Sequence, residues 1–99
     1  MDLRLRKLYT GLKKAGLDGL IVSSAENITY LTRYRSRDAY LLISKRQNVY
    51  FTDPRYIQEA RRSLRGISLK EFSGSPFKAI AQSCLSLGLG CLVFGRLLF

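Results

Sequence analysis

The sequence contains no histidine and no tryptophan. The lack of histidine excludes serine–histidine–aspartate and cysteine–histidine catalytic arrangements within this chain, and it removes the commonest ligand of transition metals. Carboxylates are also scarce, because only 7 of the 99 residues are Asp or Glu, and they are dispersed along the sequence without forming a cluster for a hard cation. An independent active site is therefore not expected.

Long hydrophobic runs and paired cysteines are lacking as well. No stretch approaches the roughly 18 apolar residues of a membrane span, and the charged N-terminus has no apolar segment typical of a signal peptide. Cys84 and Cys91 are separated by a spacing that matches no metal or redox motif, so both are interpreted as small buried side chains. A cytoplasmic protein without a membrane partner is expected.

Positive charge is what the chain has in excess. Lys and Arg number 17 against 7 acidic residues, which gives a formal net charge of +10. Such an excess attracts polyanions and can give nonspecific nucleic-acid binding. Most of these basic residues fall on the polar faces of predicted helices, where solvated charge is normal. Arg33, Arg35 and Arg37 fall together in a predicted loop.

Hydrophobic periodicity predicts nine elements in the order α-β-α-β-β-α-β-α-β, within one domain. Strands separated by helices favour parallel crossovers, whereas the short connection 45–47 favours an antiparallel hairpin. A mixed sheet with helices on its faces follows. The predicted helices cover 2–15, a short segment capped by Ser24 or Ser23, 54–64 and 77–88, and the predicted strands cover 19–23, 38–44, 48–53, 67–72 and 91–94, with 67–72 near an edge.

The segment TDPRYIQEA allows two interpretations. In the structural one, Asp53 is the N-cap of the helix 54–64, Arg55 is solvated or pairs with Glu59 at i+4, and Tyr56 packs against the sheet. In the functional one, Asp53, Arg55 and Tyr56 contact a partner or a substrate channel. The structural interpretation is favoured, because Pro54 suits the first turn of a helix.

Four stretches together resemble the N-terminal domain of the creatinase/prolidase family, in the family's order and over roughly the whole chain. The combination of NITYLT and TDPRYIQEA at this distance is the most specific part. The resemblance implies a ribonuclease-H-like α/β fold with a mixed sheet of about five strands and helices on both faces. The stretches are RLRKLYTGLKKAGLDGLIVSSAENITYLTRY, DAYLLIS followed by VYFTDPRYIQEA, ISLKEF, and LGLGCLVF.

The resemblance also implies a function. Residues 1–99 would form one N-terminal domain, truncated before the linker to a pita-bread catalytic domain of an Xaa-Pro aminopeptidase or Xaa-Pro dipeptidase, which is a hydrolase. Two divalent metal ions (Mn, Co or Zn) and their ligands would belong to that missing metallopeptidase domain, and proline-containing peptides would bind only through it. No cofactor is expected in this chain. An aminopeptidase, a dipeptidase, a creatinase-like enzyme and a pseudo-enzyme all remain open as the parent.

In the family, the N-terminal domain helps to form a homodimer, and the loop after YLT reaches the partner subunit's active-site entrance. Carried over by position, this assigns substrate or partner contact to Arg33, Tyr34, Arg35, Ser36 and Arg37. Arginine can bind a peptide carboxylate bidentately, and tyrosine offers a stiff contact surface. The sequence departs from the family at Arg33, where glycine is usual; a positive φ there would strain arginine. A merely solvated basic loop is the alternative.

A second function class stays open. A standalone basic module could bind nucleic acid or protein partners, although nucleic acid is the less favoured partner because the basic residues are scattered. A pseudo-enzyme scaffold is a third possibility. The apolar residues Leu97, Leu98 and Phe99 are predicted to fold back on the sheet or to pair with another molecule.

Overall fold

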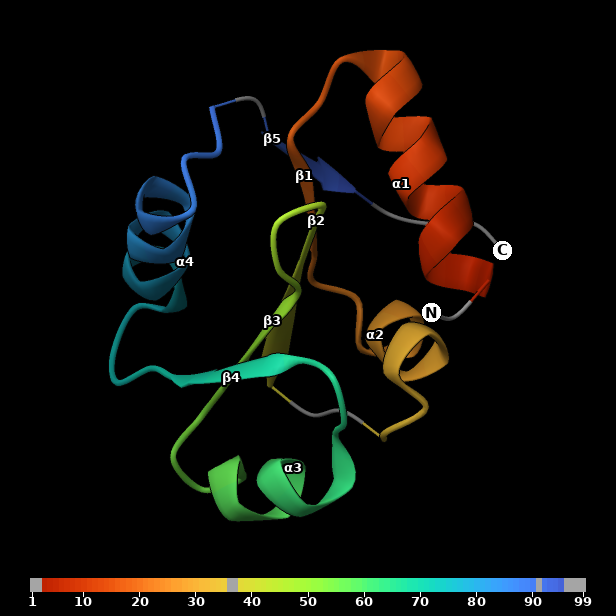
Figure 1. The fold of residues 1–99 in the computed structure, drawn as a ribbon. Helices are drawn as coiled ribbons and strands as arrows, with labels where there is room; N and C mark the ends of the chain where they lie inside the picture. The colour runs from red at the N-terminus through yellow and green to blue at the C-terminus, as the bar shows by residue number, and fades with distance from the viewer. Residues whose placement is uncertain (1–2, 36–37, 91, 96–99) are drawn as a thin grey trace.

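The structure, a computed structural model, describes residues 3–35, 38–90 and 92–95. Helices and strands alternate along the chain, and the predicted mixed α/β architecture is confirmed (Figure 1). The elements are α1 (Leu3–Ala15), β1 (Gly19–Val22), α2 (Ala25–Thr32), β2 (Ala39–Ser44), β3 (Val49–Thr52), α3 (Ile57–Ser63), β4 (Ser68–Glu71), α4 (Pro76–Ser86) and β5 (Leu92–Gly95).

The strands form one mixed sheet in the order β4-β3-β2-β1-β5. β2 and β3 make the predicted antiparallel hairpin, and β3–β4 and β1–β5 are parallel pairs. The expected parallel direction is wrong for β1 and β2, which are antiparallel even though α2 connects them. The reason is that the chain re-enters the sheet at the end where β1 left it, so no crossover is made. The edge position predicted for β4 is confirmed.

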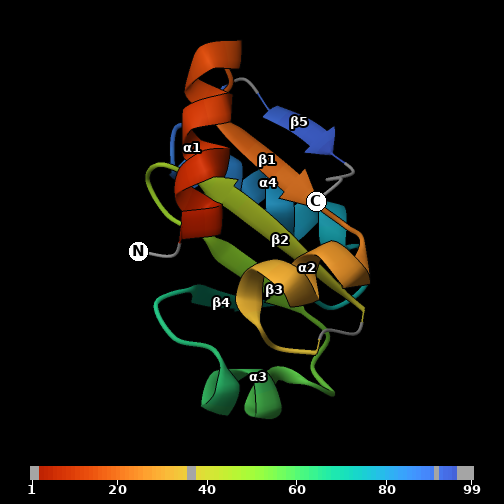
Figure 2. The ribbon, with the colours of Figure 1, turned by 90° about the vertical axis from the view of Figure 1, so that its right-hand side faces the viewer.

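The sheet separates two hydrophobic clusters. α1 and α2 cover one face and α4 covers the other (Figure 2). Because successive strand residues point to opposite faces, Val22 joins the cluster under α1 and α2, while its neighbour Ile21 joins the cluster under α4. Burying a large apolar side chain completely contributes about 1.5–3 kcal/mol. Both faces therefore stabilise the hairpin at the centre of the sheet.

One predicted helix cap is confirmed, and another is wrong. The Ser24 Oγ accepts a hydrogen bond from the Asn27 N–H (3.4 Å), so Ser24 is the N-cap of α2. The N-cap predicted at Asp53 is wrong, because α3 begins only at Ile57. The Asp53 Oδ1 instead accepts from the Arg55 N–H (2.9 Å) and closes a local turn that also holds Pro54.

Candidate functional site

The antiparallel hairpin brings the two loop motifs of the sequence together. Ala39 at the start of β2 lies opposite Thr52 at the end of β3. The loop that precedes Ala39 and the turn that follows Thr52 therefore emerge at the same end of the hairpin. We call the surface formed there the open-end site; it comprises Tyr34, Arg35, Asp38, Arg55, Tyr56 and Glu59.

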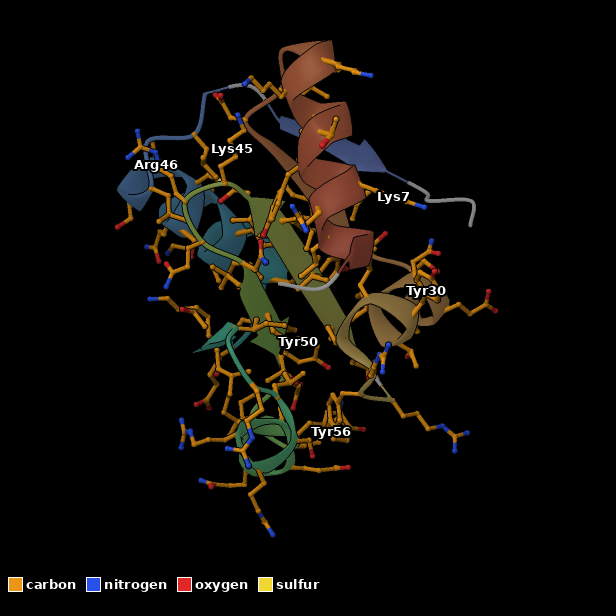
Figure 3. All side chains as sticks on the ribbon, turned by 45° about the vertical axis from the view of Figure 1, so that its right-hand side comes forward. Lys7, Tyr30, Lys45, Arg46, Tyr50 and Tyr56 are labelled. Atoms are coloured by element: carbon orange, nitrogen blue, oxygen red, sulfur yellow. The ribbon has the colours of Figure 1, made fainter. Side chains whose placement is uncertain are left out.

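A small hollow of about 190 Å³ lies within the open-end site, lined by Tyr34, Arg35, Tyr50, Tyr56 and Glu59. Tyr50 forms its wall and is only 1% exposed. The ring of Tyr34 meets the ring of Tyr50 edge-on, with centroids 6.0 Å apart. Figure 3 shows Tyr50 and Tyr56 between the sheet and α3. The hollow is thus a preformed aromatic recess with one carboxylate.

Tyr34 is held in this hollow by both packing and polar contact. Burial raises the pKa of its hydroxyl, and the negative charge of Glu59 and a hydrogen bond to the Glu59 side chain act in the same direction. A tyrosine with a raised pKa stays protonated and donates to the carboxylate. Tyr34 therefore anchors the loop rather than extending from it.

Arg33 occupies the left-handed backbone conformation, which favours glycine. It is the C-cap of α2 with φ 59°, and its N–H donates to the Thr29 carbonyl oxygen (2.8 Å). The Thr32 Oγ1 accepts from the Tyr34 N–H (3.2 Å) and so fixes the next step of the loop. The predicted condition for strain, a positive φ at Arg33, is confirmed.

Arg55 is already paired with carboxylates. Its Nε donates to the Asp53 Oδ1 (2.9 Å), its Nη2 lies 3.4 Å from the Asp38 Oδ2, and its guanidinium lies over the Tyr56 ring, 5.1 Å from the centroid. The predicted i+4 pair with Glu59 is wrong, because Arg55 lies before the start of α3. Hydrogen bonds from the Arg55 N–H and then from its side chain hold the pKa of Asp53 below its usual value.

The five loop residues predicted as contacts fall into three groups. Tyr34 is an anchor, and Arg35 is exposed at the rim of the hollow. Arg33 lines a different recess, beside α1. Ser36 and Arg37 lie outside the described residues, as do Cys91, Leu97, Leu98 and Phe99. Sequence reasoning missed Tyr50 and Glu59, since their strand and helix patterns signal only a core position and a solvated face.

The described residues offer binding groups rather than reactive ones. Among them, no three His, Cys, Asp or Glu side chains lie close enough together to hold a metal ion. Cys84 is a buried free thiol, as predicted, and burial raises its pKa, which disfavours the nucleophilic thiolate. Within the same described ranges, none of the helices is long and apolar enough to cross a membrane.

Comparison with known proteins identifies a matching family and similar structures. A family model described as the creatinase/prolidase N-terminal domain matches residues 4–92. A curated relative, the uncharacterized peptidase YqhT of Bacillus subtilis (strain 168), is 28% identical over 92 residues, which cover 93% of this chain. That alignment covers 26% of the relative, so the chain spans about a quarter of its length.

Two solved structures share the fold and part of the sequence. An Xaa-Pro aminopeptidase from Streptococcus pyogenes is 30% identical, with a TM-score of 0.85, over 97% of this chain and 74% of that chain. The N-terminal domain of cytoplasmic peptidase PepQ from Mycobacterium tuberculosis H37Rv is 25% identical, with a TM-score of 0.83, over 95% of this chain and 73% of that one.

Proposed function

The chain belongs to the creatinase/prolidase N-terminal domain family, and on that premise we propose that it is the non-catalytic N-terminal domain of a proline-specific aminopeptidase or dipeptidase. The observation that carries this proposal is the family match over residues 4–92, together with the Xaa-Pro aminopeptidase among the similar structures. Residues 1–99 act as one domain beside a catalytic domain, in which two divalent metal ions and their ligands reside.

The open-end site is the part of this domain that serves the substrate entrance of a partner subunit in a homodimer. Arg35 is the contact residue, because its side chain is exposed at the rim of the hollow. No carboxylate among residues 3–35 and 38–90 forms an ion pair with it, so its charge is available to a ligand. Arg55 is unsuitable, since two carboxylates already neutralise it. A guanidinium at this rim can bind the carboxylate of a proline-containing peptide bidentately.

The remaining assignments follow from the same proposal. The fold is a ribonuclease-H-like sheet, an assignment supported by the mixed five-stranded topology with α1 and α2 on one face and α4 on the other. The protein is cytoplasmic, which is supported by the similar domain from a peptidase whose name describes it as cytoplasmic. Ser36 and Arg37 belong to the entrance together with Arg35, because they continue the same loop.

The test uses the natural full-length polypeptide. Its coding sequence downstream of Phe99 is determined first, and a continuing frame with a metallopeptidase domain is expected. In that protein, Arg35→Gln is expected to raise KM for Xaa-Pro peptides about tenfold with little change in kcat, since one charge-assisted contact contributes about 1.5–3 kcal/mol.

The matched control is Arg61→Gln, which removes the same charge from the exposed face of α3. Kinetics unchanged by Arg35→Gln, or changed equally by both substitutions, would refute the entrance role. The absence of any catalytic domain in the gene would refute the parent activity.

A further inference from the structure

A second concave surface lies at the other end of the hairpin, where the turn between β2 and β3 closes it. Two adjoining recesses, of about 470 Å³ and 360 Å³, share four lining residues, Tyr9, Asn48, Gly66 and Ile67. They run between α1, the β2–β3 turn, the end of α2 and the connection from α3 to β4. Figure 2 shows that turn and that connection on the same side of the molecule as the first half of α1. We call this surface the basic groove.

Basic side chains line the basic groove. Lys45 and Arg46 line one recess, and Arg33 and Arg65 line the other. No Asp or Glu is among the described residues that line either recess. All of these cations are exposed. The described lining of the groove therefore carries cations and no carboxylate, and such a surface attracts a polyanion.

Helix α1 adds a second row of charge next to Tyr9. At 3.6 residues per turn, Arg6 and Lys13 lie within about 60° of Tyr9 around the helix axis, whereas Lys7 and Lys14 lie roughly 140–160° away. All four side chains are exposed. Lys45 and Arg46 stand on one side of α1, and Lys7 points away on the other side (Figure 3). The same helix thus carries two basic pairs, of which only Arg6 and Lys13 lie on the side of α1 that carries Tyr9.

Hydrogen bonds hold the centre of the groove in place. The Asn48 Nδ2 donates to the Tyr9 hydroxyl (2.6 Å), while the Asn48 Oδ1 accepts from the Ser44 N–H (3.2 Å). The Ser44 hydroxyl donates to the Gln47 carbonyl oxygen (2.7 Å). The turn that carries Lys45 and Arg46 is thereby fixed to α1. A fixed row of cations loses less entropy on binding than a mobile one.

We infer that the basic groove binds single-stranded nucleic acid, with phosphates along its cations and a base against the Tyr9 ring. Sites for single strands combine a positive groove that follows the backbone with an aromatic ring on which a base stacks. The ring of Tyr9 and the apolar side chains of Leu5, Leu31 and Ile67 line the same recess. A duplex keeps its bases stacked and paired, so only a single strand can place a base against the Tyr9 ring. The inference does not depend on the proposed peptidase function.

Fluorescence anisotropy with a labelled oligonucleotide of about 12 nucleotides tests the inference on the whole chain. The unmodified chain is expected to bind at low salt, with log Kd rising linearly against log salt. Arg6→Gln/Lys13→Gln is expected to weaken binding about tenfold and to lower the magnitude of the salt slope by roughly 1.4, for two phosphate contacts on a single strand.

The control, Lys7→Gln/Lys14→Gln, makes the same charge change on the same helix and should weaken binding less than about threefold, because only the screened general field changes. Equal losses in both double variants would show attraction to net charge alone and overturn the site. No binding at low salt would overturn it as well.

Substitutions of Tyr9 distinguish binding of a nucleic acid from binding of other anions. Tyr9→Phe keeps the ring and loses only the hydrogen bond to Asn48, whereas Tyr9→Leu loses both, so Tyr9→Leu should weaken binding at least fivefold more than Tyr9→Phe if a base stacks there. Circular dichroism confirms that both variants fold. An equal effect of the two substitutions, or competition by poly-glutamate or duplex DNA as strong as by the unlabelled strand, would contradict a single-strand site.

Discussion

The two ends of the β2–β3 hairpin use charge in opposite ways. At the open-end site, Arg55 lies between Asp38 and Asp53, and Tyr34 donates to Glu59. At the closed end, cations line a groove whose described lining contains no carboxylate. A formal charge of +10 therefore says little about where an anion binds. What matters is where the positive charge is left without a partner of opposite sign.

The two ends also differ in how their tyrosines are held. Tyr50 at the open end is 1% exposed and belongs to the core, whereas Tyr9 at the closed end is half-buried and bonded to Asn48. Both ends thus adjoin the same hydrophobic core, against which Tyr9 also packs, but the closed end relies in addition on the hydrogen bonds of Asn48. Mutations should separate these two kinds of support.

The largest effect is expected from Tyr50→Ala. Removal of this buried ring leaves a cavity beneath Tyr34 and should lower the free energy of unfolding by about 3–5 kcal/mol. Denaturant titration followed by circular dichroism measures the change. Tyr30→Ala is the control on α2, where Tyr30 is 41% exposed, and should cost about 1 kcal/mol or less. Similar losses in both variants would contradict a core role at the open end.

Asn48→Ala should give the next largest effect. It removes the hydrogen bond to Tyr9 and leaves the Ser44 N–H without its acceptor. The free energy of unfolding should therefore fall by about 1–3 kcal/mol. The turn that carries Lys45 and Arg46 should also loosen, with faster amide hydrogen exchange there. A stable variant with unchanged exchange would show that the closed end does not depend on Asn48.

A smaller effect of opposite sign is expected for Arg33→Gly. A left-handed backbone costs a non-glycine residue about 1–2 kcal/mol, and the substitution to glycine removes this cost. The greater conformational freedom of glycine in the unfolded chain offsets about 0.5–1 kcal/mol of the stability gained. Stability should therefore rise by up to about 1.5 kcal/mol, while oligonucleotide binding weakens because Arg33 lines the basic groove. A loss of stability would mean that the Arg33 side chain contributes more than the strain removes.

The smallest effect concerns pH and the open end. Because the pKa of Tyr34 is raised above its ordinary value of 10.0, the folded chain holds this proton more tightly than the unfolded chain. The resulting stabilisation is complete below about pH 10 and is lost as the pH rises through the raised value. Unfolding titrations between pH 9 and 11 should show a steeper decline for the unmodified chain than for Tyr34→Phe. Equal slopes would contradict the raised pKa of Tyr34, and with it the burial of its hydroxyl and the contact with Glu59.

The elements with clear periodicity could be predicted from the sequence. Leu5, Leu8 and Leu12 recur at helical spacing and face the sheet from α1, and Ile28 and Leu31 do so from α2. Such patterns are predictable because burial of one face decides the structure. The mixed character of the sheet follows from the same reasoning.

Predictions that depended on competing polar partners were less successful. The Asp53 carboxylate can cap a helix or close a turn, and the Arg55 guanidinium can reach more than one acid, so local rules could not choose between them. The direction of β1 against β2 depends on the path of a whole connection. The basic groove joins four separate segments, and no single stretch of sequence carries a signal for it.

The central proposal is that this chain is a non-catalytic domain that supplies binding surfaces. Hydrolysis of Xaa-Pro dipeptides and longer Xaa-Pro peptides by the purified chain, with Mn²⁺ or Co²⁺ present, tests it most directly. We expect product formation no faster than in metal-containing buffer without the chain. Saturable turnover that follows the chain through purification would contradict the proposal.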